Sequence, residues 1–265
     1  MSEQVGRRAA IAALLLLALA PASSPLPGPP SLWRDGETVR RGVRSVVVGH
    51  HTAARTLDEL ALRADRAGLR VSAVLGEPVR PLVIVPASTA EAAALARVGR
   101  VDGLAAVADG GRVIVVPEFF ARLNPVGKDV VLTHELTHVA AGTDRLPVWL
   151  YEGFADYVGY RDAGLPVTTA AAELAAEVRA GRLPSALPGP AAFAADGRDP
   201  ARLARAYQEA WLACRFLADR FGEGTLVGLY RDAQAAGVDQ ALASLGLSVA
   251  TLTARWRAYV RDQLG

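Results

Sequence analysis

The sequence predicts an α+β protein, with a mixed β-sheet and helices in its N-terminal part and helices alone in its C-terminal part. Short β-branched stretches bounded by Pro or Gly, which are typical of strands, occur only in the first half of the chain. Beyond about residue 160 the apolar residues recur at helical spacing. The 265 residues, 51% of them hydrophobic, are enough for both parts. We expect the two parts at 36–160 and 161–265, with the functional cleft between them.

Residues 1–22 have the composition of a signal peptide. Arg7 and Arg8 form a positive n-region, an apolar stretch follows, and Ala-Pro-Ala at 20–22 resembles a cleavage site. The apolar stretch is shorter than the roughly 20 residues that a membrane span needs. A Pro-rich linker is expected over 23–35. The sequence thus predicts an exported protein, extracellular or in the cell envelope. The alternative is a leader that stays uncleaved and anchors the chain.

The first elements after the linker are expected to alternate between strand and helix. Residues 43–49 are β-branched and short, which favours a strand, and 52–75 have helical spacing that Gly68 could interrupt. A second strand is bracketed by the prolines of 81–86. Ser88 is a good N-cap for the next helix, and Glu91 completes a capping box.

A β-hairpin is expected next, because Asp109-Gly110-Gly111 separates two apolar stretches at 103–108 and 112–116. After residue 160 we expect a helix from Thr168 or Thr169 to residue 180. A long irregular loop over 183–200 follows, which could cover the cleft. A helix over 201–221 and two or three further helices complete the chain.

His50 and His51 stand at the end of the first predicted strand. Neighbouring residues on a strand point to opposite faces of the sheet, so the pair is not expected to share a metal ion. The other two histidines of the chain, His134 and His138, belong to a different pattern.

The segment 130–142 contains the pattern H-E-x-x-H, formed by His134, Glu135 and His138. On a helix of about 3.6 residues per turn, His134 and His138 project from one face, one turn apart. Two imidazoles so placed can share one Zn²⁺ ion. Glu135 leaves the helix about 100° away from His134, so it is better directed at a metal-bound water. The pattern therefore predicts a zinc site on this helix.

A second helix is expected to begin at Pro147, because proline is tolerated in the first turn. It carries Glu152 and Asp156 four residues apart, hence on one face. A catalytic zinc ion takes three protein ligands and keeps one position open, so Glu152 is expected as the third ligand. The other carboxylate can accept the N–H of a ligating imidazole and fix its tautomer. A solvated helix charge is the alternative role for Asp156.

The H-E-x-x-H pattern and the segment W-L-x-E-G-x-A-D-Y at 149–157 resemble the gluzincin metallopeptidases, which are thermolysin-like zincins. The similarity is greatest to small bacterial peptidase-MA-like proteins with a W-L-x-E-G-x-A-x-Y segment. The resemblance implies a zincin-like fold, Glu135 as general base and Asp156 behind His134. It also implies one Zn²⁺ ion per chain, with the ligands His134, His138 and Glu152.

The resemblance also implies a substrate-binding strand. In gluzincins a strand that precedes the zinc helix forms a sheet edge and pairs with the substrate backbone, as in other cases of strand addition. By position the corresponding residues are Gly103, Leu104, Ala105 and Ala106. An ordinary hairpin arm is the alternative for this segment.

A donor to the oxyanion of the reaction is also needed. Thermolysin-type enzymes use a downstream histidine, but no histidine follows His138 in this chain. Tyr207 is the expected replacement, because Y-x-x-A-W at 207–211 resembles the helix on which related small gluzincins carry a tyrosine. Tyr151 and Tyr157 are the alternatives, and a core position is the alternative role for Tyr207.

The sequence predicts a zinc-dependent peptidase, that is, a hydrolase acting on a peptide or protein substrate, and a monomer. The net charge is only +2 with both signs interspersed, so nucleic acid is not expected as a partner. Contact with a membrane is expected only through an uncleaved leader. The alternative function is a catalytically idle, metal-containing exported protein that binds peptides or cell-wall polymer. Glu135 favours the enzyme, because a binding module needs metal ligands but no general base.

Overall fold

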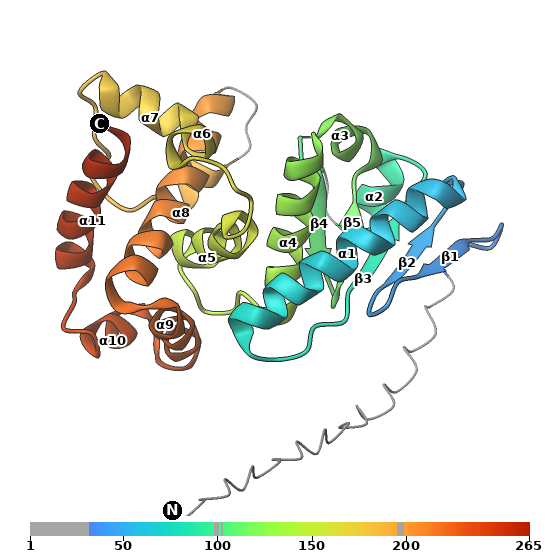
Figure 1. The fold of residues 1–265 in the computed structure, drawn as a ribbon, viewed down its shortest axis with the longest axis horizontal. Helices are drawn as coiled ribbons and strands as arrows, with labels where there is room; N and C mark the ends of the chain where they lie inside the picture. Colours follow the sequence, from blue (N-terminus) through green and yellow to red (C-terminus); the bar gives the residue numbers. More distant parts are fainter. Residues whose placement is uncertain (1–31, 98–100, 102, 195–198) are drawn as a thin grey trace, which may run out of the picture.

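The computed structural model describes residues 32–265, apart from 98–100, 102 and 195–198. In this part of the chain the protein has a mixed β-sheet and is otherwise mostly helical, so the expected α+β class is confirmed (Figure 1). Every strand of the described residues precedes the helix that carries H-E-x-x-H. The predicted signal peptide and most of the predicted linker lie outside the described residues.

The sheet has five strands in the order β1-β2-β3-β5-β4. They are β1 (Thr38–Arg41), β2 (Val46–Gly49), β3 (Leu82–Val85), β4 (Ala106–Asp109) and β5 (Arg112–Val115). The central strands β2, β3 and β5 run parallel, while β1 and β4 pair antiparallel at the two edges. The expected hairpin is β4–β5, and it makes β4 an edge of the sheet.

Each face of the sheet is covered by helices, as the alternation of buried side chains along the strands requires. Helices α1 (Ala54–Leu75) and α4 (Pro125–Ala141) pack on the face that carries the side chains of Val47, Val83 and Val113. Helix α2 (Thr89–Leu95) covers the opposite face, and Phe119 of α3 (Pro117–Arg122) packs against the same cluster of buried residues. The buried residues of this second cluster include Val46, Val48, Ile84 and Ile114.

The rest of the described chain is helical. Its elements are α5 (Val148–Tyr160), α6 (Val167–Ala170), α7 (Ala172–Arg179), the 3₁₀-helix η1 (Pro190–Phe193), α8 (Pro200–Phe221), α9 (Glu223–Ala236), α10 (Val238–Ala243) and α11 (Val249–Leu264). Helix α8 lies at the centre and contacts α5, α7, α9 and α11 (Figure 1). Trp256 of α11 and Tyr230 of α9 are among the largest fully buried side chains. No helix of the described residues is long and apolar enough to cross a bilayer.

Several local expectations need correction. Strand β1 was not expected, because its sequence Thr-Val-Arg-Arg carries little apolar signal. Helix α1 runs unbroken through Gly68, where a Cβ would lie 2.9 Å from Cγ of Pro81, so the glycine permits close packing and does not interrupt the helix. The single helix expected up to residue 180 is divided into α6 and α7 at Ala171. The loop 183–200 contains η1.

Candidate metal centre

Helix α4 positions the H-E-x-x-H residues. It begins at Pro125 after Asn124, whose side chain accepts a hydrogen bond from the Gly127 N–H at 2.8 Å. It ends at Ala141, and the next residue, Gly142, has a positive φ of 70° that suits a residue without a Cβ. His134 is buried at 9% exposure on the side of α4 that contacts α5.

Helix α5 lies close to its neighbours because it carries glycines at its contact points. A Cβ on Gly159 would stand 3.2 Å from the carbonyl oxygen of Val130 on α4. A Cβ on Gly153 would stand 2.5 Å from the carbonyl carbon of Ala210 on α8 and closer still to its oxygen. Glycine at these positions lets three helix backbones approach one another, which brings Glu152 to the histidines of α4.

Three electron-pair donors converge between α4 and α5. His134 Nε2 lies 3.0 Å from His138 Nε2 and 3.1 Å from Glu152 Oε2, and His138 Nε2 lies 3.4 Å from the same oxygen. In a tetrahedral zinc site with bonds of about 2.0–2.1 Å, neighbouring donor atoms are about 3.3 Å apart. Glu152 Oε2 is buried and has no hydrogen-bond partner among the described residues. The donor set and its spacing therefore fit a zinc ion.

The ring of His134 is held from behind by Asp156. His134 Nδ1 lies 2.8 Å from Asp156 Oδ1, and Asp156 is only 8% exposed. This excludes the solvated-charge alternative for Asp156. Burial lowers the pKa of the His134 imidazole, but Asp156 and Glu152 raise it more strongly, and the pKa lies well above its ordinary value. When the ring is neutral, as a metal ligand must be, a proton on Nδ1 shared with Asp156 leaves the Nε2 lone pair facing His138 and Glu152.

The pKa of Glu152 is shifted in the opposite direction, downward. Burial raises it, but the imidazoles of His134 and His138 outweigh burial and lower the pKa to about 2. Glu152 is therefore a carboxylate at neutral pH, which is the form that binds a metal ion.

Glu135 lies in the same cleft as this trio and reaches the edge of the sheet. Its Oε2 accepts a hydrogen bond of 2.8 Å from the backbone N–H of Ala108 on β4. Burial raises the pKa of Glu135 above its ordinary value, against the opposing effect of His134 and His138. A carboxylate that is not in the ligand trio, with a raised pKa, is suited to general-base chemistry.

The trio and Glu135 open into a cleft of about 430 Å³. Its wall includes Tyr151 and Tyr207, whose rings lie 5.8 Å from His138 and 6.2 Å from His134. Tyr207 is thus in the cleft, as expected. Tyr157 does not line the cleft, and its hydroxyl donates to Glu223 at 2.9 Å. The described residues of the loop 183–200 do not line the cleft either.

The expected substrate strand begins later than predicted. Of Gly103, Leu104, Ala105 and Ala106, only Ala106 belongs to strand β4, and Gly103 stands in a turn with φ of 87°. Leu104 and Ala106 line the cleft, together with the rest of β4 and the turn Gly110-Gly111. The apolar residues of 103–108 predicted a strand that starts too early. Apolar spacing alone does not reveal that Gly103 has a positive φ.

No motif in the sequence predicted that the segment after α4 lines the cleft. Gly142, Thr143 and Asp144 line the cleft together with residues of β4. The only signal for them was their position directly after the predicted end of the helix that carries H-E-x-x-H.

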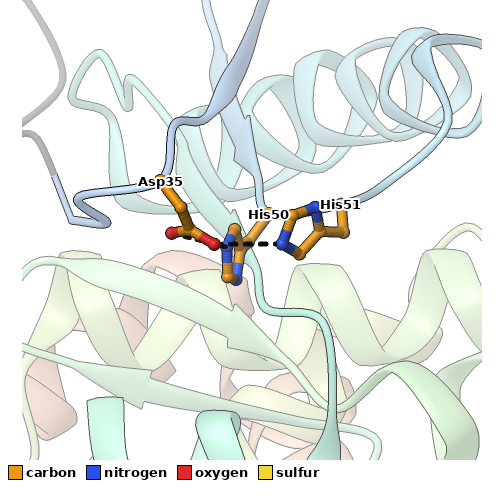
Figure 2. Close-up of side chains that lie close together, drawn as sticks. All are labelled: Asp35, His50 and His51. Atoms are coloured by element: carbon orange, nitrogen blue, oxygen red, sulfur yellow. Dashed lines mark hydrogen bonds and ion pairs between the residues drawn. The ribbon is translucent and has the colours of Figure 1, made fainter.

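The two remaining histidines also come together, contrary to the expectation that they face apart (Figure 2). The ring centroids of His50 and His51 are 4.0 Å apart, and Nε2 of each lies 3.1 Å from Oδ2 of Asp35. His50 continues the sheet, donating its N–H to Val85 O at 2.9 Å. His51 leaves it with a positive φ of 49°, so strand alternation does not apply to the pair.

Neither the protein-family models nor the curated proteins include a match to this chain. The function proposed below accordingly depends on the geometry of the cleft and of its four central residues: His134, Glu135, His138 and Glu152.

Proposed function

We propose that the protein is a zinc-dependent peptidase of the gluzincin type with a zincin-like fold. The observation that carries the proposal is the convergence of His134 Nε2, His138 Nε2 and Glu152 Oε2 in a cleft, with Glu135 beside them and outside the trio. These three residues would hold the ion. Bound zinc supplies a Lewis acid and lowers the pKa of a coordinated water to about 7.

Glu135 supplies the general base. Its carboxylate lies on the cleft wall, and one oxygen is fixed by the Ala108 N–H. The other oxygen is then available to take a proton from a water molecule in the cleft as that water attacks a carbonyl carbon. Because the pKa of Glu135 is raised toward neutral pH, its carboxyl group can also pass the proton on to the leaving amine.

The edge strand β4 supports an extended peptide as substrate. The Val116 N–H donates to Ala105 O, and pairing along the hairpin alternates, so Ala106 and Ala108 direct their N–H and C=O groups away from β5. The bond from the Ala108 N–H to Glu135 agrees with this direction. The outward C=O groups of Ala106 and Ala108 can bind the backbone of a substrate laid along β4.

Tyr207 is the proposed donor to the oxyanion. Burial, Glu152 and Asp156 raise its pKa above the ordinary value of 10.0, so its hydroxyl keeps its proton at any pH near neutrality. Phe193 of η1 packs against the ring with centroids 5.1 Å apart and restricts its position. Tyr151, whose ring lies next to that of His138, is the alternative donor.

The proposal includes export of the protein, because residues 1–22 have signal-peptide composition. It is tested by incubating the zinc-loaded protein with a mixed peptide library at neutral pH and reading fragments by mass spectrometry. Cleavage that stops after zinc is removed by a chelator, and returns when zinc is restored, is expected. A fully zinc-loaded protein that cleaves no peptide would contradict the peptidase and leave the idle binding protein.

A further inference from the structure

A second group of metal-ligating side chains lies away from the cleft. Asp35 precedes β1. His50 and His51 directly follow Gly49, the last residue of β2. Figure 1 shows β2 and α5 on opposite sides of α4, so this group is separate from the candidate metal centre. In Figure 2 the two imidazoles stand side by side with the Asp35 carboxylate next to both.

The arrangement around His50 repeats the arrangement around His134. His50 Nδ1 lies 2.8 Å from Glu91 Oε1, as His134 Nδ1 lies 2.8 Å from Asp156 Oδ1. His50 Nε2 lies 3.1 Å from Asp35 Oδ2, as His134 Nε2 lies 3.1 Å from Glu152 Oε2. In each case one carboxylate orients the ring from behind and a second carboxylate faces the other nitrogen, which is the pattern of ligating histidines in metal sites.

His50 is also held rigidly, as a metal ligand should be. It is 8% exposed, and Trp33 stacks on its ring with centroids 4.7 Å apart and an angle of 13° between the planes. Glu91 is itself fixed, because its second carboxylate oxygen accepts the backbone N–H of Ala87 at 2.5 Å. These contacts hold Nε2 of His50 toward Asp35.

Because Glu91 faces Nδ1 of His50, Nε2 is the atom that faces the carboxylate of Asp35. His51 Nε2 is directed at the same carboxylate. The three donor atoms lie within 4.8 Å of one another, close enough to share one ion.

We propose that Asp35, His50 and His51 bind a second divalent transition-metal ion of the zinc class, with Glu91 orienting His50. Two imidazoles and one carboxylate are donors that suit zinc. The ion would tie the segment before β1 to the end of β2. Because the side chains of Asp35 and His51 are 61% and 65% exposed, this ion exchanges with solvent more readily than the one in the cleft.

The test uses the division of the chain's four histidines into two pairs. Chelator-stripped protein is titrated with zinc, and bound metal is counted after gel filtration. Wild type is expected to bind two ions per chain. The double variant His134→Gln/His138→Gln is expected to bind one, and His51→Asn is also expected to bind one. Combining all three substitutions is expected to abolish stoichiometric binding.

His51→Asn is a suitable variant because the position is exposed and asparagine tolerates a positive φ. In the His134→Gln/His138→Gln background, zinc should raise the melting temperature, and adding Asp35→Asn should remove that rise. Glu91→Gln in the same background should weaken zinc binding by about 10–100-fold.

A His134→Gln/His138→Gln variant that binds no ion, or a His51→Asn variant that binds as many ions as wild type, overturns the second site. These results are independent of the peptidase proposal, which fails on absence of cleavage by zinc-loaded protein.

Discussion

Asp156 Oδ1 lies 2.8 Å from Nδ1 of His134, and both side chains are buried between α4, α5 and α8. The contact fixes which nitrogen of His134 faces the other two donors. Asp156→Asn keeps the shape but replaces the carboxylate by a weaker acceptor that also carries donors. We expect zinc affinity or activity to fall by about 10–100-fold. Competition with a chelator of known affinity measures the loss, and unchanged affinity together with unchanged activity would show that Asp156 plays no part.

Gly153 allows α5 and α8 to touch, so Gly153→Ala should destabilise the fold. The added methyl group would overlap the backbone of Ala210, and overpacking of this kind costs about 1–3 kcal/mol. Because Glu152 is adjacent, zinc affinity should fall as well. Gly228→Ala in α9 is the matched control: no atom lies within 4 Å of the new Cβ, so stability should be unchanged or rise by up to about 1 kcal/mol. Urea unfolding compares the two variants, and equal stabilities would refute the packing argument.

Tyr207→Phe should lower kcat by about 10²–10³-fold with little change in KM, if the hydroxyl binds the oxyanion in the transition state. Tyr157→Phe is the control, because Tyr157 donates to Glu223 outside the cleft wall, and its kcat should be close to wild type. Steady-state kinetics on a peptide found by the library assay measures both. If Tyr207→Phe kept the wild-type kcat, Tyr207 would not be the donor to the oxyanion, and Tyr151 would be the remaining candidate.

Glu209 on α8 should make stability depend on pH. Burial raises its pKa from 4.5 to about 7, with Arg205 opposing. A carboxyl with a raised folded-state pKa holds its proton more firmly when folded, so its stabilising contribution is complete below pH 4.5 and is lost as the pH rises through 7. Glu209→Gln should therefore raise the melting temperature more at pH 8 than at pH 5. An equal change at both pH values would contradict the shifted pKa.

The sequence was sufficient for the features that depend on local pattern. The four-residue spacing of His134 and His138 on a helix, and of Glu152 and Asp156 on the next, predicted side chains that the structure brings together. The N-cap at Ser88 and the hairpin turn at Gly110-Gly111 are also local signals, and both are present. Apolar periodicity was enough to separate the sheet from the helical part.

The features that were missed depend on contacts between distant residues or on backbone conformations that leave no pattern. The contact between His50 and His51 requires a positive φ at His51. This conformation is uncommon for residues other than glycine, and the sequence does not predict it. Asp35 reaches the two rings only because β1 folds back on β2. The bond from Ala108 to Glu135 likewise depends on how the sheet edge packs on α4, which spacing along the chain does not determine.

The proposed role of Glu135 as a base beside a zinc ion is tested most directly by the hydrolysis rate of Glu135→Gln against wild type. Gln keeps the size of Glu but cannot accept a proton from water, so we expect peptide hydrolysis to fall by about 10²–10⁴-fold. Zinc content and melting temperature should stay near wild type, because Glu135 is outside the ligand trio, whereas His138→Ala should lose zinc and activity together. A Glu135→Gln variant that binds zinc and cleaves peptide as fast as wild type would contradict the account.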